Sequence, residues 1–373
     1  MEAKGFILIC LIFKETSMRK YLLPESGNFY KANLHSHSTE SDGGLTPEQM
    51  KKVYMDHGYS IIAYTDHNVF LRHNDLTDEN FLALNGYEVD IDEEDNPLPY
   101  FMKKTCHLCF IALSPDTEIQ VAWHRSKYCS KGALLNMPRV KFDESLPDYI
   151  RNYTPECIND MIKKAKEGGF YVTYNHPSWS MEQYPDYIQY KGMDAMEIVN
   201  FTSIRNGFDE YNYQAYNDLL LAGNRIAAVY ADDNHTQNPE HPMTDLCGGF
   251  VMIKADKLEY KTITDAMLRG DYYASLGPEI KDAYIEDGKL YVKTSPVRQI
   301  TLNYGYRAKS TKRVHRTDTL EEAVFDIKQD VAAAKDSYFR ITLTDGIGLR
   351  ADTRAYFFDE DGMREALVPS NEN

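Results

Sequence analysis

Apolar runs alternate with amphipathic segments along most of the chain, and each apolar run ends in a polar cluster. Strand-like runs are predicted at 29–37, 59–68, 81–90, 105–113, 170–179, 193–200 and 225–235. Helix patterns follow several of these runs, at 46–58, 154–169, 209–224 and 262–275. This alternation predicts an α/β fold with a mainly parallel sheet. The number of units favours a barrel-type arrangement, in which functional side chains gather at the carboxyl ends of the strands.

Two of the predicted helices begin with a clear capping signal. Thr46 and Thr154 are suitable N-cap residues, and each is followed by a proline, whose fixed φ suits the first helical position. Gly58 is typical of a residue just past a helix end. A long irregular insertion is predicted at about 114–150.

The pattern changes near residue 279. The segments 280–306 and 338–358 alternate apolar and polar residues, and Asp287-Gly288 is a hairpin signal. We therefore expect three regions: an N-terminal extension at 1–27, an α/β domain at 28–278 and a small antiparallel β-domain at 279–373.

The N-terminal segment 5–13 is apolar but too short to span a bilayer. A weak signal segment is one interpretation, although little positive charge precedes it. We favour translation from Met18, with residues 1–17 as an upstream extension. Intact-mass measurement on protein from the native host tests this prediction.

Charge and cysteine content limit the classes of partner and the cellular compartment that we expect. The net charge of -16 disfavours a long nucleic acid or an anionic membrane as partner. The 6 cysteines, widely spaced in 373 residues, indicate free thiols and a cytoplasmic protein. Cys106 and Cys109 form a C-x-x-C, but a zinc ribbon needs a second pair, and residues three apart on a strand face opposite sides.

Histidines and carboxylates gather at the predicted strand ends. His35 and His37 share one strand face, and Asp233 and His235 repeat the spacing. Such a set suits zinc, manganese or iron. The further candidates at these ends are Asp42, Asp66, His67, Glu88, His107, His176, Glu197 and Asp232. The remaining histidines, which we interpret as solvated or core residues, are His57, His73, His124, His241 and His315. Of these, His124 in the insertion stays open as an alternative site residue.

Six successive motifs then resemble those of the polymerase and histidinol phosphatase (PHP) family. They are "NLHSHSTESDGGLTP", "GYSIIAYTDHN", "GYEVD", "CHLCFIAL", "YNHPSW" and "ADDNH". The resemblance covers about residues 28–278. The tail, with "YYASLGPEI" and "EDGKLYV", resembles the C-terminal β-domain of a PHP subgroup that includes carbaryl hydrolase-like proteins.

The resemblance implies a distorted seven-stranded (β/α) barrel with up to three divalent ions. His35, His37 and Asp233 would hold the first, and Glu88 would bridge it to a second. The remaining ligands would be His107 and His176 for the second ion, and Asp42, His67 and His235 for the third. Glu88, Asp233 and His235 would also take part in catalysis. Asp232 stands where the family usually has a small residue, which leaves open which aspartate is the ligand. Asp66 and Glu197 would either orient histidines or act as local acceptors.

The favoured function is hydrolysis of a small phosphate ester by metal-activated water. Candidate substrate clamps are Arg205, Arg125 and Lys127, each of which also fits an ordinary surface charge. Amide or carbamate hydrolysis on the same site is the first alternative. The second is a catalytically silent scaffold with a partner-binding β-tail, and self-association through that tail stays open.

Overall fold

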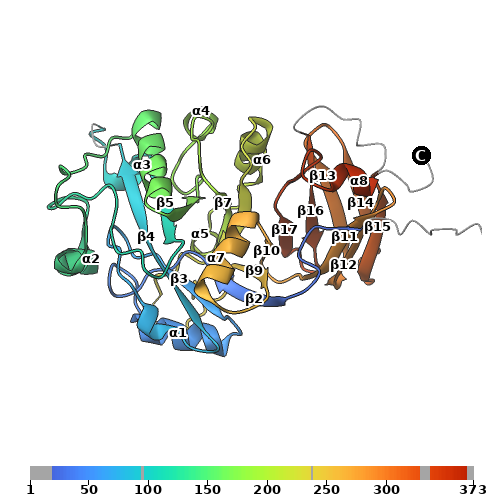
Figure 1. Cartoon of the computed structure of the whole chain (residues 1–373), viewed down its shortest axis with the longest axis horizontal. Coiled ribbons are helices and arrows are strands. Elements are labelled where there is room, and N and C mark those ends of the chain that lie inside the picture. Colours follow the sequence, from blue (N-terminus) through green and yellow to red (C-terminus); the bar gives the residue numbers. More distant parts are fainter. Residues whose placement is uncertain (1–18, 94–95, 237, 328–336, 368–373) are drawn as a thin grey trace, which may run out of the picture.

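A computed structural model describes residues 19–93, 96–236, 238–327 and 337–367. The proposed start at Met18 and the extension before it lie outside these residues. The strands of the C-terminal region form one lobe, and most of the remaining strands and most helices form the other (Figure 1). No helix in the described part of the chain is both long and apolar enough to cross a membrane.

The larger lobe is built on nine hydrogen-bonded strands in the order β10-β9-β2-β3-β4-β5-β6-β7-β8. Their bounds are β2 Asn28–Asn33, β3 Ile61–Tyr64, β4 Leu82–Asp92, β5 Thr105–Ala112, β6 Phe170–Asn175, β7 Ala195–Asn200, β8 Ala227–Ala231, β9 Phe250–Ala255 and β10 Tyr272–Ser275. All seven predicted strands are present. β9 was not predicted. β10 corrects the helix predicted at 262–275, because Gly270 ends that helix in a left-handed conformation and the next residues pair with β9 and β17.

The sheet is mixed, so the expectation of a mainly parallel sheet was wrong. β2–β3–β4 and β6–β7–β8 are parallel, but β5 runs antiparallel to both β4 and β6. Because β5 is reversed, its first residues lie at the edge where the other strands end. The segments that follow β2 and β8 also meet, through a bridge between Ser36 and Asn234 and a hydrogen bond of 3.0 Å from Asp233 N to His35 O.

Two of the main helices begin where capping signals predicted them. α1 (Pro47–Asp56) has Thr46 in a capping box, and α3 (Pro155–Glu167) is capped by Thr154. α6 (Tyr213–Leu221) begins later than the predicted 209–224, and α7 spans Tyr260–Arg269. The short helices are α2 Lys131–Asn136, α4 Tyr184–Tyr187, α5 Phe201–Arg205 and α8 Met363–Leu367. Single 3-10 turns lie at Asn74–Leu76, Tyr100–Met102 and Met137–Arg139.

The C-terminal strands are antiparallel, as predicted. They are β11 Ile280–Glu286, β12 Lys289–Val297, β13 Gln299–Tyr304, β14 Lys309–Arg313, β15 Leu320–Asp326, β16 Tyr338–Thr344, β17 Arg350–Thr353 and β18 Tyr356–Phe357. Asp287 and Gly288 both have positive φ, as the predicted two-residue hairpin requires.

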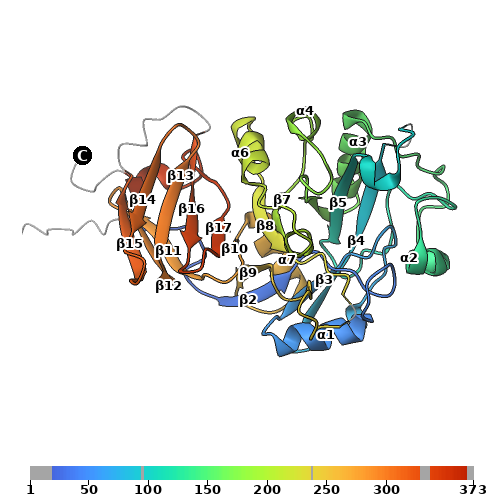
Figure 2. The ribbon, with the colours of Figure 1, turned by 180° about the vertical axis from the view of Figure 1, so that it is seen from behind.

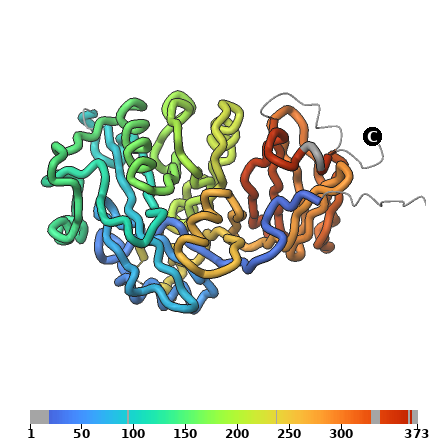
Figure 3. Tube along the Cα trace, viewed as in Figure 1, coloured from blue at the N-terminus to red at the C-terminus, as the bar shows by residue number. Residues whose placement is uncertain are grey.

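The two lobes share backbone pairing at both chain ends. β1 (Lys20–Tyr21) pairs with β11, so the N-terminal segment starts in the C-terminal lobe and then crosses to β2 (Figures 2 and 3). β17 pairs with β10, so the large sheet continues into the smaller lobe. A separate apolar cluster nevertheless fills the C-terminal lobe, with Ile285, Leu302 and Ile341 fully buried. The lobes are therefore two cores joined by one continuous sheet.

Candidate metal centre

The reversed β5 and the curled sheet bring distant strand ends to one place. Histidines and carboxylates from β4 and β5, and from the segments after β2, β3, β6 and β8, face one another there. Three groups have ligand atoms within 4.8 Å of one another: His35, His37, Glu88 and Asp233; Glu88, His107 and His176; and His37, Asp42, His67 and His235. These groups contain all nine predicted ligands.

The first group is almost wholly buried. Asp233 Oδ1 lies 3.2 Å from His35 Nε2 and 2.9 Å from His37 Nε2. The same His35 nitrogen is 3.2 Å from Glu88 Oε1, and the two Nε2 atoms face each other at 3.1 Å. Four potential ligand atoms thus converge from three strand ends.

Glu88 joins the first group to the second. Its Oε1 is 3.1 Å from His107 Nδ1 and 3.4 Å from His176 Nε2. Its Oε2 is 3.4 Å from His37 Nε2 and 3.2 Å from His67 Nδ1. This carboxylate therefore contacts members of all three groups, which is the position of a bridging ligand.

The third group surrounds Asp42 nearer the surface. Asp42 Oδ1 is 3.4 Å from His235 Nε2 and 4.0 Å from His67 Nε2. His37 Nδ1 also approaches it, at 3.8 Å. The structure thus adds His37 to the three residues expected in this group, since its two ring nitrogens face different carboxylates.

Unused polar atoms indicate that the site suits cations. Among the nine predicted ligands, four buried atoms make no hydrogen bond to any described residue: His37 Nδ1, His67 Nδ1, Glu88 Oε2 and His107 Nε2. Two ligands about 2.1 Å from one tetrahedral ion lie roughly 3.4 Å apart. The contacts of 3.1–3.4 Å around Glu88 match that spacing. The donor set therefore fits divalent metal ions.

The pKa values of three residues in these groups are in keeping with a cation site. Burial alone would lower the pKa of His37, but Asp233 and Glu88 outweigh burial and raise it well above its ordinary value. Burial likewise opposes the charge of Asp233, yet the surrounding histidines hold its pKa below the usual range. Burial, helped by nearby His37, lowers the pKa of His67 to about 4. The carboxylates thus favour positive charge at this place, which metal ions would supply as they displace protons.

The backbone resolves which aspartate faces the cluster. Asp232 accepts hydrogen bonds from the amides of Gly248 at 2.9 Å and Gly249 at 2.7 Å, and from the Tyr54 hydroxyl at 2.7 Å. Asp233, with a left-handed φ of 54°, turns its carboxylate toward the histidines. Such a conformation is costly for a non-glycine residue and concentrates at functional sites.

The roles of Asp66 and Glu197, which the sequence left open, are different. Glu197 Oε2 lies 2.8 Å from His35 Nδ1, so it orients that imidazole. Asp66 instead accepts from Ser38 N and Ser41 Oγ at 2.8 and 2.7 Å, and so it holds the loop after β2.

Two asparagines that contact the ligands were not predicted from the sequence. Asn175 donates to Glu88 Oε1 at 2.8 Å, and Asn200 donates to Asp233 Oδ2 at 2.9 Å. Asn175 precedes His176 in a motif already singled out, and Asn200 ends a predicted strand. Their strand-end positions were the available signal.

A cavity of about 710 Å³ opens over the centre. None of the three predicted clamps is among its described lining residues. Arg125 pairs with Asp148 at 2.7 Å, and Arg205 bonds the carbonyl of Pro242. The basic residue that lines the cavity is instead Lys131, whose Nζ is 3.1 Å from Asp42 Oδ2.

His124, the alternative site residue, and His73 lie apart from the three groups. His124 is buried against the Tyr128 ring, 5.5 Å away. His73 forms a separate group with Glu40 and Asp66, and Glu40 is also paired with Arg139 at 2.6 Å. No described cysteine belongs to any such group, so the zinc-ribbon interpretation has no support.

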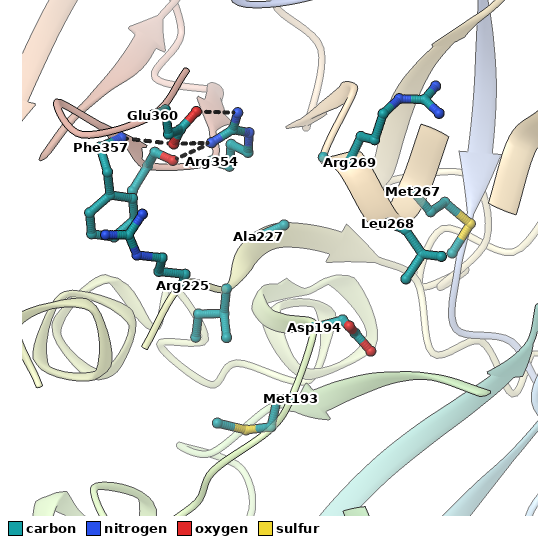
Figure 4. A pocket seen from close by; sticks show the side chains of 13 residues that line it. Met193, Asp194, Arg225, Ala227, Met267, Leu268, Arg269, Arg354, Phe357 and Glu360 are labelled. Carbon is teal, nitrogen blue, oxygen red and sulfur yellow. Dashed lines mark hydrogen bonds and ion pairs between the residues drawn. The ribbon is translucent and has the colours of Figure 1, made fainter. Parts of the chain in front are cut away.

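A second cavity, of about 350 Å³, lies at the opposite ends of β7 and β8 (Figure 4). Its lining includes three arginines. Arg354 is paired with Glu360, Arg225 with Asp359 and Arg269 with Asp271, at 2.6–2.8 Å. These pairs neutralise the arginine charges of the cavity, and the Arg225–Asp359 pair also links the two lobes.

Comparison with known proteins completes the description. No family model and no curated protein matches the chain. Its structure is similar to a two-domain protein from Bacteroides vulgatus that contains a predicted PHP-like metal-dependent phosphoesterase, with 15% identity, 90% of this chain and 98% of that chain covered, and a TM-score of 0.41. An amidohydrolase from Chromobacterium violaceum, solved with sulfate and no metal, matches at 14% identity over 65% of this chain and 96% of its own, with a TM-score of 0.37.

Proposed function

We propose that the protein is a metal-dependent hydrolase that cleaves a small phosphate ester. The observation that carries this proposal is the set of three ligand groups joined by Glu88, two of them buried and the third partly buried. The six PHP-like motifs support it, because they supply these same side chains in order along the chain. We further propose that residues 28–278 form the distorted seven-stranded barrel of that family, and that 279–373 form its accompanying β-domain.

Two or three ions of zinc, manganese or iron would be held by the nine predicted ligands. When bound, such ions lower the pKa of coordinated water and offset the charge of a phosphate. Glu197 would keep a proton on His35 Nδ1, which leaves Nε2 as the ligand atom. A contact of 2.9 Å between His235 Nδ1 and Asp233 O does the same for His235. Glu88 and Asp233 are buried, which strengthens the attraction of their carboxylates for cations.

The expected substrate is small. The net charge of -16 and the acidic rim residues Asp90 and Asp92 oppose a long polyanion. The described cysteines are all free, in keeping with a cytoplasmic role.

The first test is elemental analysis of wild-type protein beside His37→Ala and the control His57→Ala, whose histidine is exposed after α1. The same samples are screened with phosphomonoesters, phosphodiesters and carboxyl or carbamoyl esters. We expect at least two bound ions in the wild type and in the control, with both metal and phosphatase activity lost in His37→Ala. Activity on carboxyl or carbamoyl esters alone would mean that the enzyme hydrolyses carbonyl compounds and not phosphate esters. Absence of metal, with no rescue by zinc, manganese or iron, would favour the silent scaffold.

A further inference from the structure

We propose that Lys131, carried by the insertion at 114–150, binds the phosphoryl oxygens of the substrate and favours a terminal, dianionic phosphate. This inference rests on the proposed phosphoesterase function. It deepens that function by naming a substrate-binding residue and the charge of the group it takes.

Lys131 differs in charge from the other side chains that line the cavity outside the metal ligands. It is the one lysine or arginine among the described residues that line the space over the metal centre. The other walls carry Asp90, Asp92 and Asp245. An anionic group can therefore bind favourably only on the side of the metal ligands and Lys131, away from these carboxylates.

The backbone around Lys131 is built for this placement. Tyr128 and Lys131 both have left-handed φ values, of 72° and 47°. Gly132 N donates to Ser41 O at 2.7 Å, and a side chain at Gly132 would meet that oxygen at 2.4 Å. Asn136 Nδ2 donates to Glu40 O at 2.9 Å. Strain of this kind persists only where the surrounding contacts fix it.

The insertion is also anchored on its other side. Tyr128 O accepts from Asn68 Nδ2 at 2.9 Å, and the Arg151 guanidinium lies 4.3 Å from the centre of the Tyr128 ring. Buried Arg151 also donates to Asn68 Oδ1 at 2.6 Å and to Asp90 O at 2.8 Å. Contacts on both sides thus hold the Lys131 backbone beside the ends of β3 and β4.

The Lys131 ammonium is paired with Asp42, and metal binding would weaken this ion pair. Lys131 Nζ contacts Asp42 Oδ2, while Asp42 Oδ1 faces His235 at 3.4 Å. Once a cation shares the Asp42 charge, this carboxylate attracts the ammonium less. The side chain of Lys131 is 67% exposed, so its stem is free to swing toward a phosphate. Lysine binds phosphate well as a compact point charge.

The test uses Lys131→Met, the conservative Lys131→Arg and the control Lys127→Met, all in the metal-loaded full chain. Lys127 is an exposed lysine of the same insertion that does not line the cavity. Inorganic phosphate is the probe, measured by calorimetry and as a competitive inhibitor, and metal content is measured in every sample.

We expect Lys131→Met to weaken phosphate binding and to raise KM for a phosphomonoester by on the order of tenfold, as loss of a charged hydrogen bond predicts. The loss should be smaller for a phosphodiester, which carries one charge fewer. Lys131→Arg should retain most of the affinity, and Lys127→Met should match the wild type. Metal content should be unchanged throughout.

Phosphate affinity of Lys131→Met within about twofold of the wild type overturns the proposal, because a charged contact is worth more than that. A loss of phosphate binding that parallels a loss of metal also overturns it, since Lys131 would then only position Asp42. Calorimetry needs no turnover. A wild type that binds phosphate but hydrolyses no ester therefore refutes the phosphoesterase function, while Lys131 is still judged by binding.

Discussion

At the scale of single residues, the centre depends on side chains that hold other side chains. His35 can present only one ring nitrogen to a cation because the other is bonded to Glu197. Asn200 in turn fixes one oxygen of Asp233. Such partners set the direction and the protonation of each ligand before any ion arrives.

Replacing Glu197 tests this arrangement. Glu197→Gln removes the negative charge but keeps the shape, so His35 loses its strongest orienting partner. We expect metal affinity to fall by about 10–100-fold, as is typical for such partners. Titration against a fluorescent metal chelator measures the change. Glu167→Gln, on the exposed end of α3, is the matched control. An unchanged dissociation constant would mean that Glu197 plays no part in the centre.

At the scale of elements, one reversed strand and one insertion complete the site. β5 runs against its neighbours, so His107, near its start, reaches the edge where the other strands end. The insertion then lies along the segment 39–41 and brings Lys131 to the cavity. Close backbone contact at Gly132 makes this docking possible.

We expect Gly132→Ala to disturb the docking selectively. A Cβ atom there would lie 2.4 Å from Ser41 O and 2.5 Å from Thr39 O, so the insertion must move. Overpacking of this kind costs about 1–3 kcal/mol of unfolding free energy. KM for a phosphomonoester should rise while metal content is retained. Urea denaturation and steady-state kinetics measure both effects. The control is Gly346→Ala, where the added methyl meets nothing within 4 Å. Equal effects in the two variants would argue against the docking contact.

At the scale of the whole molecule, a buried ion pair of the smaller lobe contacts tyrosines of the larger lobe. Arg340 of β16 is fully buried, 3.1 Å from Asp352 of β17, and its guanidinium lies 4.1 Å from the centre of the Tyr213 ring. Asp352 also accepts from the hydroxyls of Tyr211 and Tyr230, at 2.7 and 2.5 Å. Tyr230 belongs to β8, the strand that leads to Asp233. The smaller lobe therefore supports a strand that carries the centre.

Asp352→Ala should be among the most damaging substitutions outside the site. It leaves the Arg340 charge buried and unpaired, which costs about 3–5 kcal/mol of unfolding free energy. The double variant Arg340→Met with Asp352→Ala should recover part of that loss, because the charge is removed as well. Urea denaturation measures both variants. A loss below about 1 kcal/mol would mean that water or another group compensates the arginine.

Much of this protein follows from short-range patterns in its sequence. The caps at Thr46 and Thr154, the Asp287-Gly288 hairpin and the alternation of apolar positions depend on residues close along the chain. The spacing of His35 and His37 is equally local, since alternate strand residues share a face. For that reason the capped starts of α1 and α3, the seven strands and the antiparallel tail were predicted. The nine candidate ligands, in contrast, were named because the six motifs resemble those of the PHP family.

The tertiary structure decided what depends on partners far apart in sequence. The direction of β5 and the pairing of β10 with β17 are set by sheet neighbours, and no local pattern encodes them. The difference between Glu197 and Asp66 has the same origin, since both lie within predicted strand runs and only packing determines which one meets a histidine. Lys131 was not predicted as a site residue, because it lies in the insertion at 114–150, which carries no motif. Its role emerges only from docking, because the cavity it enters is assembled from several separate segments.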